Sequence, residues 1–385
     1  MKLYRLYLNK IWQLSLIDFV LVFGIASFTT VWPVYLKKVL QNDTMVGVFS
    51  ALISLASILL SLLFIPIIEK YPKVKIFSIS AVGMFISLLA YSYTQNIYAV
   101  ILISAIFVAS MVFHQNSFGI MIRDQSSASE IGKTEGILFT LLNLSFIISP
   151  LIAGLIMSQV GLSEVFIFSA IFIFTAFIMF RIAIQIKEVP RNGELHKNLF
   201  KNLKDFFKNK ELVKIYVVSM GISWWWGFIY TYPPLLILDK GLDPLLIGVF
   251  LFFIPIPLLL EFIVGKMSDN MGFRRFIFSG FVILAIASAL AFFETNIYMV
   301  LAYLVLASFG AAMIEPLREA YFFKVTNQEE EEKYYGAFLT AVDSGHMLGK
   351  LLNAGILIFL PFKFIFLAIF LMMLLFAYSS LKLEK

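Results

Sequence analysis

Four polar side chains stand in one row within a long apolar segment near the end of the chain. In AVDSGHMLGKLLNAG, the residues Asp343, His346, Lys350 and Asn353 follow one another at spacings of three, four and three. Side chains three or four positions apart lie on one face of a helix. This row can carry a proton or bind an anionic solute. The alternative is an ion-pair network that holds two parts of the molecule together.

Further ionisable residues interrupt apolar segments. Asp18 lies in LSLIDFVLVFG, and Glu315 lies in AAMIEPLREA. A charge at mid-bilayer costs about 2.5–3.5 kcal/mol on insertion scales, so each needs a functional or structural reason. We expect Asp18 and Glu315 to hold protons or cations, with structural hydrogen bonds as the alternative for Asp18. The other candidates for a coupling or substrate cavity are His114, Gln115, Trp224 and Trp225.

The composition is that of a membrane protein. Of 385 residues, 61% are hydrophobic and 14% charged, and the mean hydropathy is +0.91. Soluble domains have about 25% charged residues. The absence of cysteine excludes disulfides, thiolate metal sites and cysteine nucleophiles. The three histidines lie far apart, without the spacing of metal ligands, so we expect no metal and no cofactor.

The apolar runs predict an all-α integral membrane protein with twelve spanning helices. A helical span needs roughly 20 apolar residues, and backbone groups in lipid must bond internally. The predicted spans are 11–36, 46–68, 76–94, 97–122, 136–158, 165–186, 213–238, 246–268, 276–293, 297–322, 336–360 and 363–381.

The placement of Lys and Arg predicts the orientation. The side that holds the N-terminus collects most of them, while the other side receives Lys37, Lys38, Lys240 and Lys363. Cytoplasmic loops carry the excess of positive charge, so both termini are predicted to be cytoplasmic, in the cell membrane. The sequence pI of about 9.2 reflects this topology, and we infer no nucleic-acid partner.

The sequence repeats itself at an offset of about 200 residues. NIYAV at 96–100 recurs as NIYMV at 296–300, and Pro33-x13-GVF recurs as Pro234-x13-GVF one residue out of step. Matches at a common offset indicate a duplicated six-helix unit, and an even number of helices gives parallel repeats. We predict an N-terminal bundle over 1–186, a linker over 187–212 and a C-terminal bundle over 213–385.

The central loop carries apolar residues at helical spacing with lysines between them. This pattern predicts a basic amphipathic helix on the cytoplasmic membrane face. We favour a plain linker role for it over a regulatory or lipid-binding role.

One charged turn carries a family resemblance. GKMSDNMGFRR at 265–275, between spans 8 and 9, resembles the G-x-x-x-D-x-x-G-x-R-R signature of the major facilitator superfamily. The twelve spans in two sets of six and the long central loop resemble that family as well. The equivalent first-half turn, IPIIEKYPKVK, departs from the signature, with Ile65, Glu69 and Pro72 in place of Gly, Asp and Gly.

The resemblance implies a cytoplasmic gate. Asp269 would meet the start of span 5 near Gly136, and the weaker counterpart would meet the start of span 11 near Gly336. Gly265 would permit close helix packing and Gly272 a sharp reversal. For Arg274 and Arg275 we favour simple anchoring. The complete predicted gate set is Gly265, Asp269, Gly272, Arg274, Arg275, Arg318, Glu69 and Arg123.

Span 5 is similar to the antiporter motif of the same superfamily, G-x8-G-x3-GP-x2-GG. The stretch keeps the spacing, with small residues in place of some glycines. Such residues allow close helix packing. The positions concerned are Gly136, Ser145, Ser149, Pro150, Ala153 and Gly154.

The resemblance implies a secondary transporter that moves a small solute by alternating access. We expect proton-coupled efflux of amphipathic, drug-like compounds, by a monomer that binds the solute and protons within the bilayer. The alternative is proton- or sodium-coupled uptake, or uniport, of a sugar, organic acid or peptide. A non-transporting receptor or a polytopic enzyme on the same scaffold is a minor alternative, since the only carboxylate cluster, at 329–332, has the pattern of a solvated loop.

Overall fold

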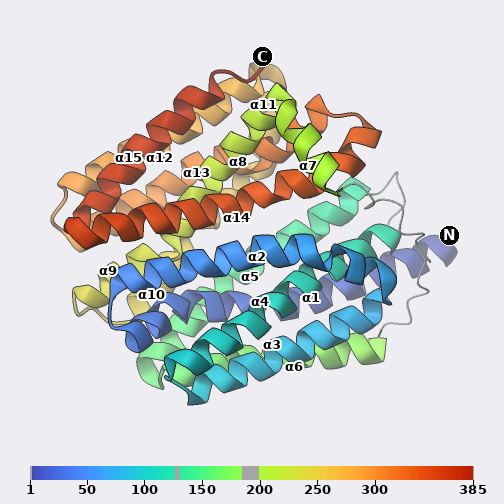
Figure 1. Cartoon of the computed structure of the whole chain (residues 1–385), viewed down its shortest axis with the longest axis horizontal. Helices are drawn as coiled ribbons and strands as arrows, with labels where there is room; N and C mark the ends of the chain where they lie inside the picture. The colour runs from blue at the N-terminus through green and yellow to red at the C-terminus, as the bar shows by residue number, and fades with distance from the viewer. Residues whose placement is uncertain (1, 126–130, 184–198, 385) are drawn as a thin grey trace. The chain divides into compact units, whose positions relative to one another are not determined.

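The computed structural model of the chain describes residues 2–125, 131–183 and 199–384, and the regular structure in these ranges is helical (Figure 1). The elements are α1 (Lys2–Leu40), α2 (Asp43–Lys70), α3 (Lys73–Tyr93), α4 (Ile97–Gln125), α5 (Ile131–Gln159), α6 (Leu162–Ala183), α7 (Leu199–Lys208), α8 (Lys210–Ile229), α9 (Tyr232–Asp239), α10 (Leu245–Phe253), the 3-10 helix η1 (Ile256–Leu260), α11 (Glu261–Met271), α12 (Phe273–Phe293), α13 (Ile297–Val325), α14 (Gln328–Phe359) and α15 (Lys363–Ser380).

Every predicted span is helical in its described part, although two of them are interrupted. Span 7 divides into α8 and α9 at Tyr230–Thr231, directly before a Tyr-Pro-Pro sequence. Span 8 divides into α10, η1 and α11 around Pro255 and Pro257. Proline has no N–H to donate to the helix ladder, so paired prolines end a helix that apolar length alone would continue.

Ten helical segments of the described chain are long and apolar enough to cross a membrane. The two predicted spans outside this set have physical explanations. Span 8 is cut short by its prolines, and α14 carries the charged residues of the stripe together with an acidic first turn. The twelve-helix fold predicted from the sequence is therefore consistent with the structure, with ten long apolar segments and two modified ones.

The chain forms two compact units. The first comprises residues 1–39, 59–196 and 243–252, and the second comprises 40–58, 197–242 and 253–385. The first part of α2 clusters with the second unit, and α10 clusters with the first.

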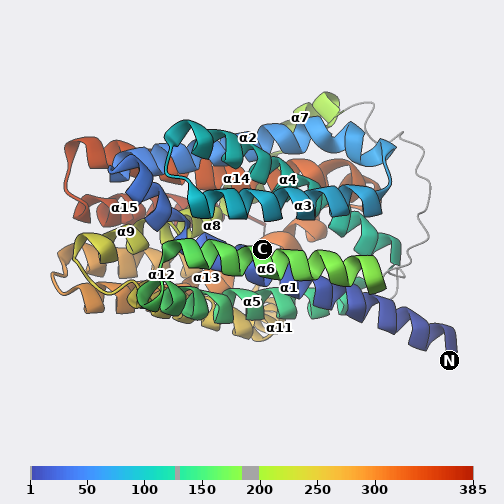
Figure 2. The same ribbon diagram turned by 90° about the horizontal axis from the view of Figure 1, so that it is seen from below.

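The same helix neighbours recur in the two units. In the first unit, α3 packs against α4 and α6, and these helices lie side by side in both views (Figures 1 and 2). In the second unit, α12 packs against α13 and α15, which are the corresponding elements of the sequence repeat. The buried Phe77 and Phe180 illustrate the first core, with ring centroids 4.1 Å apart between α3 and α6.

Within the described residues, the central amphipathic helix is α7 (Leu199–Lys208). It runs across the direction of α8 and α14 within the second unit (Figure 1). Phe206 is fully buried against the rings of Tyr216 and Tyr334, and Asp205 accepts a bond from Lys333 at 3.3 Å. The apolar face of α7 is thus used for packing on the second unit, and Lys201, Lys204 and Lys208 remain exposed.

Candidate functional site

A buried carboxylate–imidazole pair lies in the first unit. Asp18 of α1 and His114 of α4 approach to 3.3 Å between Oδ1 and Nε2, and their side chains are 7% and 5% exposed. This is an ion-pair distance, although the atoms are not aligned as a hydrogen bond. The rings of Phe77 and Phe118 pack beside the imidazole. In such apolar surroundings an unbalanced charge is costly, which is a physical reason for the carboxylate and the imidazole to lie together.

The polar stripe on α14 meets two different neighbours. Asp343 accepts a hydrogen bond from Ser57 of α2 at 3.0 Å, and the amine of Lys350 lies 3.4 Å from the hydroxyl of Ser54. His346 lies instead beside Gly227 of α8. The stripe is therefore anchored on α2 through Asp343 and Lys350, and on α8 through His346.

Asn353 completes the stripe and is fully buried. Neither atom of its amide has a hydrogen-bond partner among the described residues. A buried amide without partners is costly, since it has lost its water and gained nothing in exchange. Asn353 thus stays a candidate for contact with a solute or an internal water.

A second cluster of charges gathers around α13. Arg318 donates through Nε and Nη2 to the same oxygen of Glu315, at 3.0 and 2.7 Å. The other oxygen of Glu315 accepts from the indole of Trp226 at 3.0 Å. Glu319, one turn further along, accepts a hydrogen bond from Tyr335 of α14. Among the residues that the structure describes, no three acidic or histidine side chains converge as a metal site.

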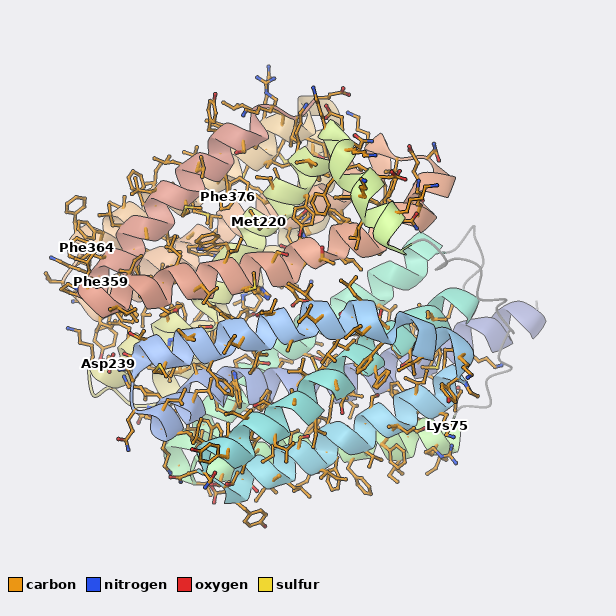
Figure 3. The ribbon with its side chains drawn as sticks, viewed as in Figure 1. Lys75, Met220, Asp239, Phe359, Phe364 and Phe376 are labelled. Atoms are coloured by element: carbon orange, nitrogen blue, oxygen red, sulfur yellow. The ribbon has the colours of Figure 1, made fainter. Side chains whose placement is uncertain are left out.

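The three consecutive tryptophans of α8 have different surroundings. Trp224 packs closely on Gly349 and near the ring of Phe376 (Figure 3), and Trp225 is fully buried against Phe228. These placements favour a packing role for both. Of the three tryptophans, Trp226 donates the hydrogen bond to Glu315. The ring of Tyr230, directly after the end of α8, is centred 6.1 Å from that of Trp226.

Two residues of the polar contacts were not singled out from the sequence. Ser54 and Ser57 of α2 fall three positions apart and are followed by Ser61 at the same face. This serine row in an apolar span was the available signal. Gln115, in contrast, is exposed on α4, and its role stays a prediction.

The antiporter-like segment of α5 makes close helix contacts in the first unit. Ser145 donates to the carbonyl of Phe19 on α1 at 3.1 Å, and Ser149 and Ala153 are fully buried. A Cβ placed on Gly154 would lie only 2.8 Å from the Cα of Gly248 on α10. The carbonyl of Pro150 also contacts Gly248, so these backbones touch without intervening side chains.

The gate turn is described only in part. Gly272 has a φ of +87°, in the region that favours glycine, and it ends α11 and begins α12. Among the described residues, no atom lies within 4 Å of a Cβ placed on Gly265. Arg274 is half-buried and Arg275 exposed. The side chains of Glu69, Arg123 and Asp269 and the surroundings of Gly136 lie outside the described part of the structure.

Long apolar helices, a duplicated sequence and buried charges on facing helices together define a multi-pass membrane transporter. The sequence matches the model of the Major Facilitator Superfamily over residues 14–260 and again over 225–383. The chain therefore belongs to this superfamily. It is a transporter rather than the polytopic enzyme kept as a minor alternative. No curated protein sequence matches the chain significantly.

Solved structures of the same fold are similar over nearly the whole chain. A POT family transporter in complex with 5-aminolevulinic acid has a TM-score of 0.79 at 11% identity, covering 98% of this chain and 97% of that chain. A mutant form of the nucleoside transporter NupG has a TM-score of 0.80 at 14% identity, covering 97% of this chain and 100% of that chain. At these identities the likeness concerns the fold alone.

Proposed function

We propose that the chain is a proton-coupled secondary transporter that moves a small polar solute across the cytoplasmic membrane by alternating access, as a monomer. The single observation that carries the proposal is the buried pair of Asp18 and His114. Ionisable groups inside a membrane bundle are expensive and are typical of proton relays. A proton that enters or leaves this pair changes its net charge, and the packing of α1 against α4 responds.

The charges of the second unit indicate the chemistry of the solute. Asp343 and Lys350 on α14, and Glu315 and Arg318 on α13, supply both signs within one unit. Groups of both signs suit a solute with an anionic and a cationic group better than they suit a lipophilic cation. Structures of similar fold are described with 5-aminolevulinic acid and with a peptide conjugate, and another is a nucleoside transporter. These compounds are the first probes to use.

Export is the second candidate, and one observation favours it. The antiporter-like segment of α5 makes a glycine-to-glycine crossing between Gly154 and Gly248. Close backbone packing of this kind is what the small residues of such a segment provide. In this case protons move inward while an amphipathic solute moves outward, and the same coupling pair serves both directions.

The test is solute flux in proteoliposomes with an imposed pH gradient. The probes are a dipeptide, 5-aminolevulinic acid, a nucleoside and a lipophilic cation. Wild type is compared with Asp18→Asn and His114→Gln, and with Asp205→Asn as a matched control on α7, outside the spanning helices. We expect both pair variants to lose about tenfold or more of gradient-driven accumulation, while exchange without a gradient persists.

The polarity of the gradient that drives accumulation separates uptake from export. Flux that ignores the gradient in wild type contradicts proton coupling. A full gradient response in Asp18→Asn contradicts the assignment to this pair. If Asp205→Asn loses as much as Asp18→Asn, the effect is not specific to the buried pair.

A further inference from the structure

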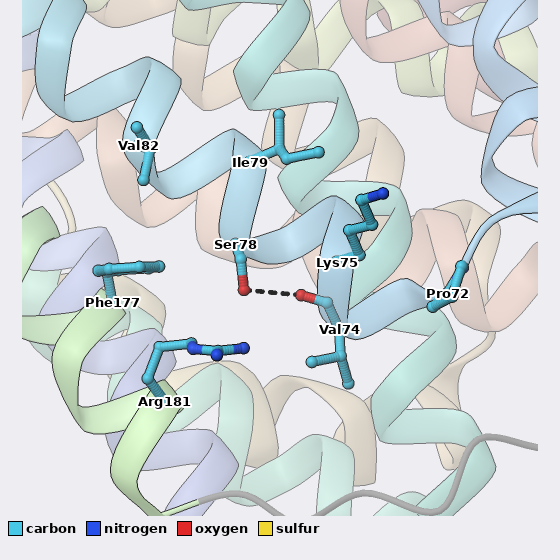
Figure 4. A pocket seen from close by; sticks show the side chains of 8 residues that line it. All are labelled: Pro72, Val74, Lys75, Ser78, Ile79, Val82, Phe177 and Arg181. Carbon is cyan, nitrogen blue, oxygen red and sulfur yellow. Dashed lines mark hydrogen bonds between the residues drawn. The ribbon is translucent and has the colours of Figure 1, made fainter.

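A groove between α3 and α6 lies on the surface of the first unit, and none of its lining residues belongs to the polar sites described above. It has a volume of about 670 Å³ and is walled by both helices (Figure 4). Its lining residues are Pro72, Val74, Lys75, Ser78, Ile79, Val82, Phe177 and Arg181. The groove thus combines two cations with an apolar wall, and no acidic side chain is among these lining residues.

The two cations come from opposite walls. Arg181 extends from the last turn of α6 toward Val74 and Ser78 of α3 (Figure 4). Lys75 stands on α3, and its amine points away from Arg181 in that view (Figures 3 and 4). Both side chains are exposed, and neither has an ion-pair partner among the described residues. Ser78 bonds the carbonyl of Val74 at 2.8 Å, so its hydroxyl is already used as a donor. The cations are therefore available for an external anion.

The apolar part of the groove faces outward along the helices. Ile79 is 57% exposed and Val82 38%, while the floor between the helices is closed by the buried rings of Phe77 and Phe180. In a membrane such a surface contacts acyl chains, not water. The two cations lie at the end of these helices that the distribution of Lys and Arg assigns to the cytoplasmic side.

We propose that the α3–α6 groove binds an anionic phospholipid of the cytoplasmic leaflet. The phosphate and anionic headgroup lie against Lys75 and Arg181, and one acyl chain runs along Ile79, Val82 and Phe177. Basic pockets between membrane helices bind anionic headgroups in this way. A zwitterionic lipid fits less well, because its headgroup adds a cation next to two cations.

The sequence repeat supplies a matched comparison in the second unit. Arg275 on α12 is 200 residues beyond Lys75, but the position 200 residues beyond Arg181 is Leu381. The neighbouring Lys382 lies over the ring of Tyr378, at 5.2 Å. The equivalent surface of α12 and α15 therefore lacks the pair of opposed cations, and Arg275→Ala with Lys382→Ala removes the same charge without touching the groove.

The test is native mass spectrometry of the purified full chain with three added probes: phosphatidylglycerol, phosphatidylcholine and the water-soluble headgroup glycerophosphoglycerol. We expect wild type to retain phosphatidylglycerol in preference to the other two. Lys75→Ala with Arg181→Ala should weaken retention about tenfold, since each cation near an anionic surface contributes to the attraction. Lys75→Arg with Arg181→Lys should retain it, as should Arg275→Ala with Lys382→Ala.

Thermal unfolding of the delipidated proteins checks that each variant is folded. Equal retention of phosphatidylglycerol by the double alanine variant overturns the proposal. So does an equal loss in the second-unit variant, which indicates general surface charge. Equal binding of phosphatidylcholine excludes an anion-selective site, and equal binding of the soluble headgroup indicates a site for a free phosphate compound instead of a lipid.

Discussion

Two helix crossings at equivalent places in the sequence repeat are packed with different chemistry. In the first unit α10 crosses α5, and Gly248 meets Gly154 with backbone against backbone. In the second unit α2 crosses α14, and Gly47 lies against Ala354. A Cβ added to Gly47 would lie 2.9 Å from the Cβ of Ala354. Gly154 and Ala354 are 200 residues apart, and Gly47 and Gly248 are 201 apart. The duplication has thus preserved where the helices touch.

The residues around the two crossings are what differ. Pro150 on α5 corresponds to Lys350 on α14, and both present a carbonyl to the crossing glycine. The second crossing adds hydrogen bonds, from Lys350 to Ser54 and from Ser57 to Asp343. Near the first crossing, the side-chain hydrogen bond of Ser158 is with the exposed Asp243, just before α10. A glycine contact is insensitive to protons, whereas a buried polar contact changes when a partner gains or loses charge. We infer that the first crossing is a fixed packing contact and that the second is able to respond to chemistry.

The largest expected effect is at the glycine crossing. Gly248→Ala places a methyl group against the backbone of α5, which cannot move aside as a side chain can, and should cost about 1–3 kcal/mol. Gly47→Ala should cost less, because it meets the side chains of Ala354 and Tyr232. The measurement is thermal unfolding of the purified variants in detergent.

Gly355→Ala is the control for both, because no atom lies within 4 Å of its added Cβ. It should leave the unfolding temperature unchanged or raise it, since alanine is the better helix former. An equal loss for Gly47→Ala and Gly248→Ala would remove the distinction between the two crossings.

The next effect tests the polar side of the comparison. Asp343→Asn, Ser57→Ala and the double variant form a cycle around one hydrogen bond. We expect a coupling of about 1–2 kcal/mol, because bonds to a charged group in a bundle are stronger than neutral ones. The readout is again the unfolding transition. Strict additivity of the two single changes would show that the contact does not hold α2 on α14.

A smaller effect is expected for the ion pair of Arg318 and Glu315, in which the guanidinium donates two hydrogen bonds. Arg318→Lys removes the two-pronged contact with Glu315, and a lysine amine cannot reproduce its geometry. The loss should be about 1 kcal/mol and should change little as salt is added, because a pair that is mostly buried is only weakly screened. Arg275→Lys, at an exposed position, is the matched control and should change nothing. If both variants unfold like wild type, the two hydrogen bonds of Arg318 to Glu315 do not contribute to stability.

The smallest effect is expected at α7, which packs on the second unit. The pKa of Lys333 is raised, mainly by its contact with Tyr334 and further by Asp205. A raised lysine pKa means that this contact is fully present at neutral pH and is lost only as pH rises through the raised value, above about 10.4. Lys333→Met should therefore lower the unfolding temperature slightly at neutral pH and leave it unchanged in strongly alkaline buffer. A loss that persists in alkaline buffer would show that the lysine stem, not the charge, is responsible.

Much of the architecture was predictable from short-range features. Apolar length predicted every helical span, and the common offset predicted the correspondence of α3–α6 with α12–α15. The prolines that divide spans 7 and 8 were visible in the sequence, but an apolar run long enough to span outweighed them in the prediction. The interruption is a backbone effect that hydropathy does not register.

The candidate site was predictable in part. Helical spacing placed Asp343, His346 and Lys350 along one helix, because side-chain direction follows the turn of the helix. It did not show that Ser54 and Ser57 lie opposite, since those contacts join residues 296 and 286 positions apart. It also left the choice among three consecutive tryptophans open, and the rotation of α8 in the bundle turned Trp226 toward Glu315.

The order of residues along the chain is enough to define the class of protein: a helical, duplicated membrane protein with a few ionisable residues inside its apolar segments. The packing of the helices was needed to bring Asp18 to His114, although 96 residues separate them. It was also needed to bring Gly248 to Gly154 across two helices. The reason is physical. The periodicity of a helix determines which of its residues share a face, and only the packing of the helices determines which face of another helix lies against them.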